Sequence, residues 1–318
     1  TGIIPKINAY ADVASSLRMK NMQQVQSWLP GSTGEPQVNP LSAGAAQYPT
    51  VGRAALFQSI EDQGMEKAIA ANLKLAVADL SKSLGDLQTY TNNNYFERVA
   101  VYVGFSASGG TGCGLFYDVL MILINILKKE LEGTKFDIMP ALLLPSTFER
   151  VLGPSALKRA NLNAATALVD LASMIEQMMS SNAANVDSSS VVYPGGGPAM
   201  TLGGMDSNVQ MPVSAVISST AGMSRDDTVR MLAAAIVTQV SLSGGQDANQ
   251  GQVTNTMTFG EDVLNVVSGD YLNPRSVMPK PLMPMVSASL TVPSRSIADI
   301  VAKNLLVQSF EQENGFFA

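Results

Sequence analysis

The sequence predicts an α/β protein in which a parallel β-sheet is flanked by helices, followed by a smaller C-terminal α+β domain. Apolar runs that suit strands alternate with helical patterns, and this alternation is typical of a parallel sheet. The strand-like runs are nearly continuous, as expected for strands buried on both faces. With 318 residues, of which 46% are hydrophobic, the chain is long enough for two domains. We place their boundary near Gly251, which gives domains 1–250 and 251–318.

The elements follow in order from the N-terminus. A helix is expected from about Tyr10 to Trp28, before Pro30, and another from Val51 to Val77 with a break at Gly64. The clearest strand is Val99 to Phe105. The remaining elements of the first domain are a helix from Leu115 to Leu131, a strand from Phe136 to Leu144, a helix from Ala156 to Met179, a strand from Val213 to Ser218 and a helix from Asp226 to Leu242.

Two regions differ from this alternation. Residues 180–210 are rich in Ser, Asn, Gly and Pro, so we expect a long surface excursion there rather than core. Beyond residue 251 the pattern predicts strands at 263–267 and 286–292 and a helix at 296–310.

Composition excludes several functional classes. The chain has no histidine and one cysteine, Cys113, so His-dependent nucleophilic triads, Cys/His zinc sites and intrachain disulfides are excluded. The net charge is −6 and no run of basic residues exists, which argues against direct contact with nucleic acid. The most apolar helical stretch, 115–127, has about 13 residues where a membrane span needs about 20. We therefore expect a soluble, cytoplasmic protein with no membrane span.

A glycine-rich segment, Ser106 to Gly114, lies between the clearest strand and the next helix. Backbone N–H groups and the positive end of the helix dipole converge at such a position, and glycines let phosphate oxygens approach the backbone. The segment lacks the Gly-Lys-Ser/Thr ending of a P-loop, the G-x-G-x-x-G spacing of dinucleotide sites and the second glycine of a nucleophile elbow. It is therefore a phosphate-binding loop of another type, or a plain glycine-rich turn.

The segment Ser108-Gly-Gly-Thr-Gly-Cys-Gly114 resembles the phosphate loop of the tubulin/FtsZ family, G-G-G-T-G-S/T-G. Ser108 stands for the first glycine and Cys113 for the usual hydroxyl residue, and both are small. The resemblance implies a Rossmann-like GTPase sheet. It also implies nucleotide contacts by the loop residues Ser108, Gly109, Gly110, Thr111, Gly112 and Cys113.

A second match lies upstream. Leu41-Ser-Ala-Gly-Ala-Ala-Gln-Tyr-Pro-Thr-Val-Gly-Arg-Ala-Ala55 is similar to the FtsZ stretch L-G-A-G-A-N-P-x-V-G-R-x-A-A, allowing a short insertion. In that family the Ala-Gly loop contacts the γ-phosphate, so Ala43, Gly44 and Ala45 inherit this role. Taken alone, the segment also suits a turn of small residues before a helix.

A third match follows the second strand. Leu144 to Glu149 and then Lys158-Arg-Ala160 are similar to the FtsZ pattern P-F-x-x-E-G-x-x-R-x-x-A, with a longer spacing between Glu and Arg. The resemblance assigns Glu149 to the ribose region and Arg159 to the phosphates. Asn163, one helical turn on, faces the same pocket in this interpretation. A solvated position at the start of a helix is the alternative for Arg159.

Three family features are displaced or altered. The first glycine-rich loop of the family falls at or before residue 1, so the N-terminal strand and first loop are expected to be missing. The guanine-reading Asn is not visible after the third strand, where Asp226 or Asp227 could accept from guanine or simply cap a helix. Asp247 in Gly244–Asn249 is the local candidate for the catalytic acid, although the family pattern N-x-D-x-x-D is absent.

The resemblance implies a cytoskeletal protein that binds GTP or GDP with Mg²⁺ and forms filaments. Its partner is a second copy of itself in a head-to-tail homopolymer, with GTP hydrolysis coupled to assembly. The altered catalytic and guanine positions leave a second hypothesis, a non-hydrolysing tubulin-like scaffold with a degenerate nucleotide site. A third is an unrelated α/β enzyme that acts on a phosphorylated small substrate.

Overall fold

A computed structural model shows how the chain is arranged. It describes residues 9–38, 40–91, 98–130, 135–179, 190–202, 209–211, 214–219, 224–243, 282–284 and 299–304. The chain divides into two compact units, Thr1–Val286 and Ser287–Ala318, and the candidate site lies in the first. The boundary predicted near residue 251 lies outside the described residues, as do the strands predicted at 263–267 and 286–292.

A parallel sheet forms the centre of the first unit. Its order is β1 (Arg98–Ser106), β2 (Lys135–Leu143), β6 (Ser214–Ile217) and β7 (Leu282–Pro284), and β5 (Val209–Gln210) also pairs with β2. Every pairing within this sheet is parallel. The segments that follow β1, β2 and β6 therefore leave the sheet at the same edge, where parallel α/β sheets bind ligands.

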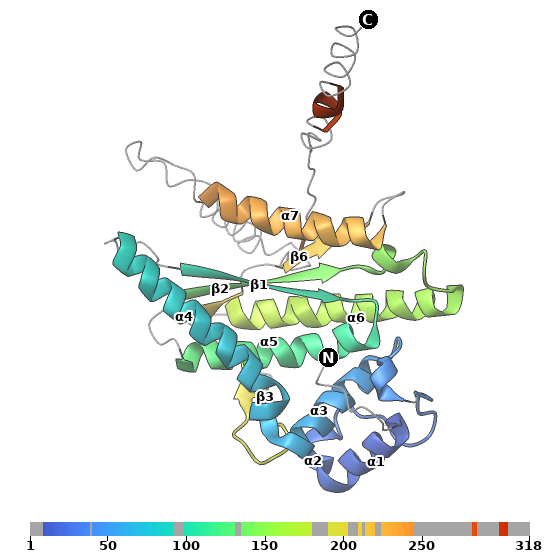
Figure 1. Cartoon of the computed structure of the whole chain (residues 1–318). Helices are drawn as coiled ribbons and strands as arrows, with labels where there is room; N and C mark the ends of the chain where they lie inside the picture. The colour runs from blue at the N-terminus through green and yellow to red at the C-terminus, as the bar shows by residue number, and fades with distance from the viewer. Residues whose placement is uncertain are drawn as a thin grey trace, which may run out of the picture. The chain divides into compact units, whose positions relative to one another are not determined.

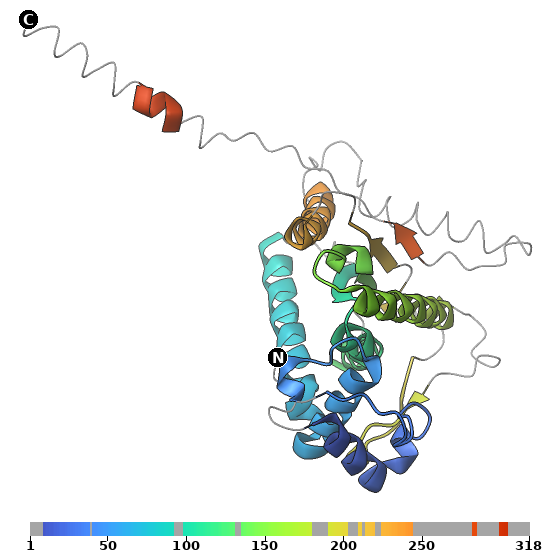
Figure 2. The ribbon, with the colours of Figure 1, turned by 90° about the vertical axis from the view of Figure 1, so that its right-hand side faces the viewer.

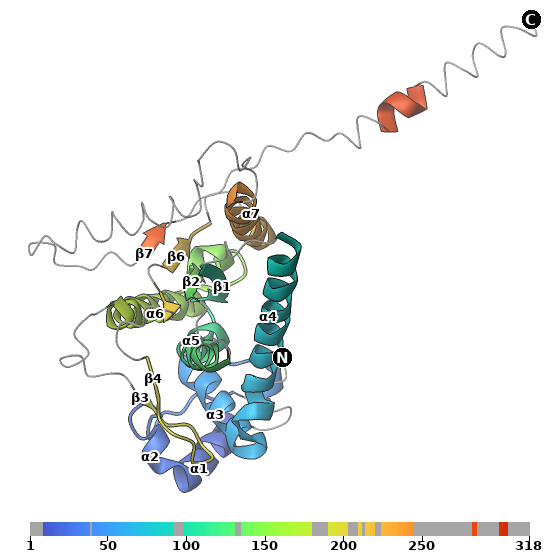
Figure 3. The same cartoon turned by 90° about the vertical axis from the view of Figure 1, so that its left-hand side faces the viewer.

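Helices cover both faces of this sheet, as Figures 1 and 3 show. Helix α7 (Arg225–Ser243) lies on one face, and α5 (Gly110–Glu130) and α6 (Pro154–Met179) lie on the other. Leu232 of α7 faces Gly104 of β1, where a Cβ would lie 3.7 Å from the leucine side chain, an ordinary van der Waals contact. The predicted α/β class with a helix-flanked parallel sheet is confirmed.

An additional helical layer packs beneath α5 (Figure 2). It consists of α1 (Tyr10–Lys20), α2 (Met22–Val25) and α3 (Pro49–Met65). The single helix predicted from Tyr10 to Trp28 is wrong, because Asn21 leaves the helical conformation with φ −131°. The buried Asn21 side chain donates instead to the Glu61 carboxylate of α3 at 3.0 Å. This tertiary hydrogen bond lies at the residue where α1 ends.

The break predicted at Gly64 is confirmed, since its φ of 78° is available mainly to glycine. The helix beyond it, α4 (Ala71–Thr91), runs well past the predicted end at Val77. Helix α5 begins at Gly110, five residues before the predicted start at Leu115. Glycines have low helix propensity, so the sequence pattern alone places this start too late.

Helix α5 is also longer than the apolar stretch considered in the sequence. By length and composition it could cross a membrane, but 67% of its most apolar part is buried inside the protein. The wholly buried side chains include Leu120, Met121, Ile122 and Ile124. The apolar composition of α5 is therefore that of a core helix.

The expectation that residues 180–210 form only a surface excursion is wrong for the part that the structure describes. A hairpin of β3 (Ser190–Val191) and β4 (Met200–Thr201) packs on α5. Tyr193 and Leu202 are 4% and 1% exposed. The Gly and Pro residues between the two strands are typical of surface loops, so the sequence pattern does not predict these core contacts.

Candidate functional site

Two loops touch through their backbones at the carboxyl edge of the sheet. The first is the glycine loop, residues 106–114, and the second is the Ala-Gly loop, residues 43–48. The Gly110 N–H donates to the Ala46 carbonyl at 2.6 Å. A Cβ on Gly110 would lie 2.5 Å from the Tyr48 carbonyl oxygen and 2.6 Å from that of Ala45. Only glycine fits at position 110. Gly110, which the sequence assigned to phosphate binding, therefore also permits the contact between the two loops.

The two loops lead into helices whose N-termini are adjacent. Helix α3 begins at Pro49 and α5 at Gly110. A Cβ on Gly52 would lie 2.4 Å from the Gly110 carbonyl oxygen, and one on Gly114 would lie 2.2 Å from that of Pro49. The positive ends of two helix dipoles therefore converge on one place, an arrangement that favours an anion.

Unpaired hydrogen-bond donors are present at this place. Within the described part of the chain, no acceptor takes the backbone N–H of Thr111 or Gly112, and no partner takes the Ser108 hydroxyl. Ser108 is only 4% exposed, and a buried hydroxyl without a partner is costly. Phosphate oxygens are acceptors that would satisfy all three donors.

Cys113 plays a different part from the loop donors. Its thiol lies 2.8 Å from the Ala107 carbonyl oxygen, to which it donates inside the loop. Burial, and to a smaller extent the Asp170 carboxylate, raise the pKa of Cys113 to about 12. The thiol therefore stays protonated, and its hydrogen bond to the Ala107 carbonyl stabilises the loop.

Helix α6 places two predicted residues against both loops. Asn163 Nδ2 donates to the Gln47 carbonyl at 3.0 Å and lies 3.4 Å from the Ser108 carbonyl oxygen, so this side chain bridges the two loops. The guanidinium of Arg159, one turn earlier, lies 4.8 Å from the centre of the Tyr48 ring, within cation–π range. The structure thus brings Arg159 and Asn163 to the same site as the glycine loop.

The Ala-Gly loop has an unusual backbone. Gly44 has φ 108°, and Ala46 has φ 47° in the left-handed region that residues with a Cβ seldom adopt. The Ala46 carbonyl accepts the short bond from Gly110, which compensates for this conformation. Ala43 and Ala45 flank the turn, and Ala45 is buried. Strained backbone of this kind is common at ligand sites.

The segment after β2 is attached to the end of β6. Ser146 Oγ lies 2.8 Å from Ser218 Oγ, and the Ser219 N–H donates to Ser146 Oγ at 3.1 Å. Glu149 follows directly and is exposed. Thr147 has a buried hydroxyl with no partner among the described residues. Ser146 and Thr147 lie inside the third family match, which assigned a role only to Glu149 in this segment, so sequence analysis named neither of them.

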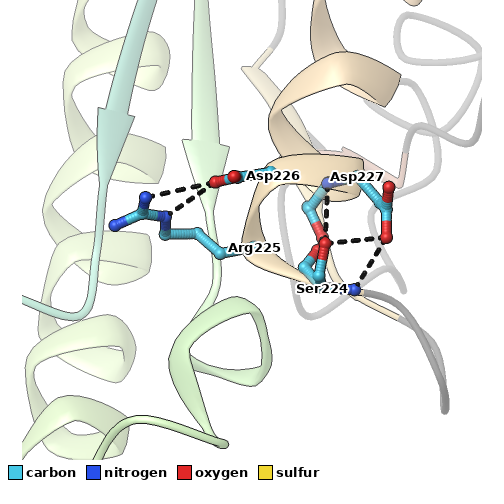
Figure 4. A network of polar contacts seen from close by, with 5 residues as sticks. Ser224, Arg225, Asp226 and Asp227 are labelled. Carbon is cyan, nitrogen blue, oxygen red and sulfur yellow. Dashed lines mark hydrogen bonds and ion pairs between the residues drawn. The ribbon is translucent and has the colours of Figure 1, made fainter.

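Asp226 and Asp227, at the start of α7, make different contacts (Figure 4). Asp227 accepts from the Ser224 N–H at 3.1 Å, and its own N–H donates back to Ser224 Oγ at 3.1 Å, which is a reciprocal cap. These hydrogen bonds from Ser224 lower the pKa of Asp227. Asp226 pairs instead with Arg225 at 3.1 Å and is exposed. Asp247, the candidate catalytic acid, lies outside the described residues.

The structure shows a parallel α/β protein in which two loops meet at adjacent helix N-termini, and this place is the candidate anion site. A model of the tubulin-like family matches residues 6–311 of the 318, and the chain belongs to this family. No curated protein matches the chain. Among solved structures, CetZ from Methanosaeta thermophila strain DSM 6194 is similar, with 14% identity and a TM-score of 0.34. The match covers 80% of this chain and 56% of that one, so the chain spans little more than half of its length.

Proposed function

We propose that this protein binds GTP at the contact between the glycine loop and the Ala-Gly loop and assembles head to tail with further copies of itself. The observation that carries the proposal is the backbone contact of these loops at two adjacent helix N-termini, in a chain of the tubulin-like family. The site has donors for phosphate oxygens and lacks the features of other phosphate loops.

Each loop has a distinct part in this proposal. The N–H groups of Thr111 and Gly112 and the Ser108 hydroxyl donate to the inner phosphates. Ala43 to Ala45 lie across the contact and receive the γ-phosphate. A terminal phosphate therefore has to meet both loops at once, while a diphosphate depends mainly on the glycine loop.

Three further residues support the nucleotide. Arg159 has a guanidinium near the loops, where it offsets phosphate charge, and Asn163 holds the loops together. Glu149 is exposed beyond β2 and accepts from the ribose. Asp226, at the exposed start of α7, accepts from guanine.

We assign Mg²⁺ chiefly to the phosphates. Among the residues that the structure describes, no group of three acidic, His or Cys side chains could hold a metal. Mg²⁺ commonly keeps several waters and binds through phosphates with few protein carboxylates, so this arrangement suits the site. Hydrolysis is coupled to assembly if Asp247 of one copy reaches the phosphates of the next.

The test compares Thr111→Asp with its isosteric control Thr111→Asn. An acid in the first turn of a helix favours the helix, and Asn has the same shape as Asp, so both variants should fold. The carboxylate of Thr111→Asp faces the phosphates, and GTP affinity measured by calorimetry should fall more than tenfold. Thr111→Asn and wild type should bind GTP similarly, and neither should bind ATP.

Sedimentation and phosphate release then test assembly. GTP-dependent pelleting with phosphate release supports the full proposal. Pelleting without phosphate release supports the alternative function, a non-hydrolysing scaffold, which the altered catalytic pattern favours. Binding of ATP or a sugar phosphate in place of GTP would overturn the proposal, and so would equal GTP binding by Thr111→Asp and Thr111→Asn.

A further inference from the structure

A buried polar network lies directly below the two loops, and the ligand-binding roles above do not use it. Asp118 of α5 has no exposed surface and lies about two helical turns beyond Gly110. Arg53 of α3 follows Gly52, where a Cβ would lie 2.4 Å from the Gly110 carbonyl oxygen of the glycine loop. Arg53 donates from one terminal nitrogen to Asp118 Oδ1 at 3.0 Å, and its Nε lies 3.0 Å from Oδ2. The pair therefore joins α3 to α5 by one hydrogen bond and a second close ionic contact, in which Nε and Oδ2 do not have hydrogen-bond geometry.

The hairpin at 190–202 supplies the third member. The Tyr193 hydroxyl donates to Asp118 Oδ1 at 2.9 Å. Burial, and then the Asp118 charge, raise the pKa of Tyr193, so the hydroxyl remains a donor. The Tyr193 ring packs 5.3 Å from the ring of Phe57, and the Arg53 guanidinium lies 4.8 Å from the ring of Trp28. Three segments far apart in sequence, α3, α5 and the hairpin, thus meet at one carboxylate.

Such a network fixes the relative position of the helices more than it stabilises the folded state. Burial raises the pKa of Asp118 although Arg53 and Tyr193 both lower it, so desolvation of the carboxylate outweighs the ionic attraction. An apolar contact between two helices can slide, whereas a buried ion pair with a directional hydrogen bond is kept over only a narrow range of registers. Arg53 and Asp118 therefore fix α3 against α5 at one height.

The loops that continue from these helices move with them. The first turns of α3 and α5 are in backbone contact, so a shift of one helix changes the distance between the Ala-Gly loop and the glycine loop. We propose that Arg53, Asp118 and Tyr193 are positioning residues that set this distance, and that the 190–202 hairpin thereby tunes the preference of the site for GTP over GDP. This inference rests on the proposed function, because only a γ-phosphate has to meet both loops.

The experiment compares the dissociation constants of GTP and GDP for three forms of the full chain. Tyr193→Phe removes the hydroxyl and keeps the ring. Asn125→Ala is the matched control, because Asn125 donates to the Thr201 carbonyl at 3.3 Å and holds the same hairpin on the same helix outside the network. We expect Tyr193→Phe to weaken GTP binding about fivefold to tenfold, since a hydrogen bond to a charged group is lost. GDP binding should change less than about twofold, and Asn125→Ala should keep the wild-type ratio.

Arg53→Lys provides a second variant should Tyr193→Phe fold poorly, because lysine keeps the charge and loses the planar guanidinium that reaches both Asp118 oxygens. It should shift the GTP/GDP ratio in the same direction. A variant that weakens both nucleotides equally would show a merely structural role and overturn the inference, as would an unchanged ratio. Absence of GTP binding by the wild type would instead overturn the proposed function, so the two failures are distinguishable.

Discussion

Replacing Gly110 by alanine is the sharpest test of the loop contact. The new Cβ would lie 2.5 Å from the Tyr48 carbonyl oxygen, 2.6 Å from the Tyr48 nitrogen and 2.6 Å from the Ala45 carbonyl oxygen. All three atoms belong to the backbone, so no flexible side chain can move aside. The Ala-Gly loop must therefore move away from the glycine loop.

The magnitude follows from two costs and one gain. Overpacking of this kind costs about 1–3 kcal/mol, and losing the hydrogen bond from Gly110 to Ala46 costs about 0.5–1.5 kcal/mol. Alanine has a higher helix propensity than glycine, which stabilises the start of α5 by up to about 1 kcal/mol. The sum is a destabilisation of about 0.5–4.5 kcal/mol, so the contact outweighs the propensity and the protein stays folded.

Gly109→Ala is the matched control for this variant. Its Cβ would meet only the Ala46 carbonyl oxygen at 3.8 Å, which is ordinary van der Waals contact. Urea unfolding gives the free energy of unfolding of each variant, and calorimetry gives its GTP affinity. We expect Gly110→Ala to lower the free energy of unfolding and to weaken GTP binding more than tenfold. The free energy of unfolding of Gly109→Ala should stay within about 0.5 kcal/mol of the wild-type value. Equal unfolding free energies for the two variants would refute the reasoning.

Three further predictions concern other parts of the site. Asn163→Ala removes the bridge between the loops and should lower the free energy of unfolding by about 1–2 kcal/mol in urea, with weaker GTP binding; an unchanged value would contradict the bridge. Because the pKa of Cys113 is raised to about 12, iodoacetamide at pH 8 should alkylate it about a thousandfold more slowly than an exposed thiol until urea unfolds the chain; rapid native labelling would disprove its burial. The lowered pKa of Asp227 means that its stabilisation of α7 is present above the ordinary carboxyl pKa near 4 and is lost as the pH falls through the folded-state value. Thermal melts followed by circular dichroism from pH 6 to pH 2 should therefore show a smaller acid-induced loss in Asp227→Asn, and identical profiles would count against the cap.

The sequence alone determined the α/β class, the order of the main strands and helices of the first unit, and the place of the glycine loop. These features are local: buried parallel strands need continuous apolar runs, and a loop that admits an anion needs glycines next to a helix start. The break at Gly64 could be predicted for the same reason, because a positive φ is a property of one residue. The three family motifs also predicted which segments would lie near one another.

Only the tertiary structure decided how those segments meet. Asn163 reaches Gln47 across 116 positions, Arg53 reaches Asp118 across 65, and Tyr193 reaches Asp118 across 75. No periodicity encodes such pairs, because each depends on the register of one packed element against another. The early start of α5 and the burial of Tyr193 and Leu202 have the same origin. Local pattern indicates where an element can form, and packing against distant side chains decides where it ends, what it covers and which loops it brings together.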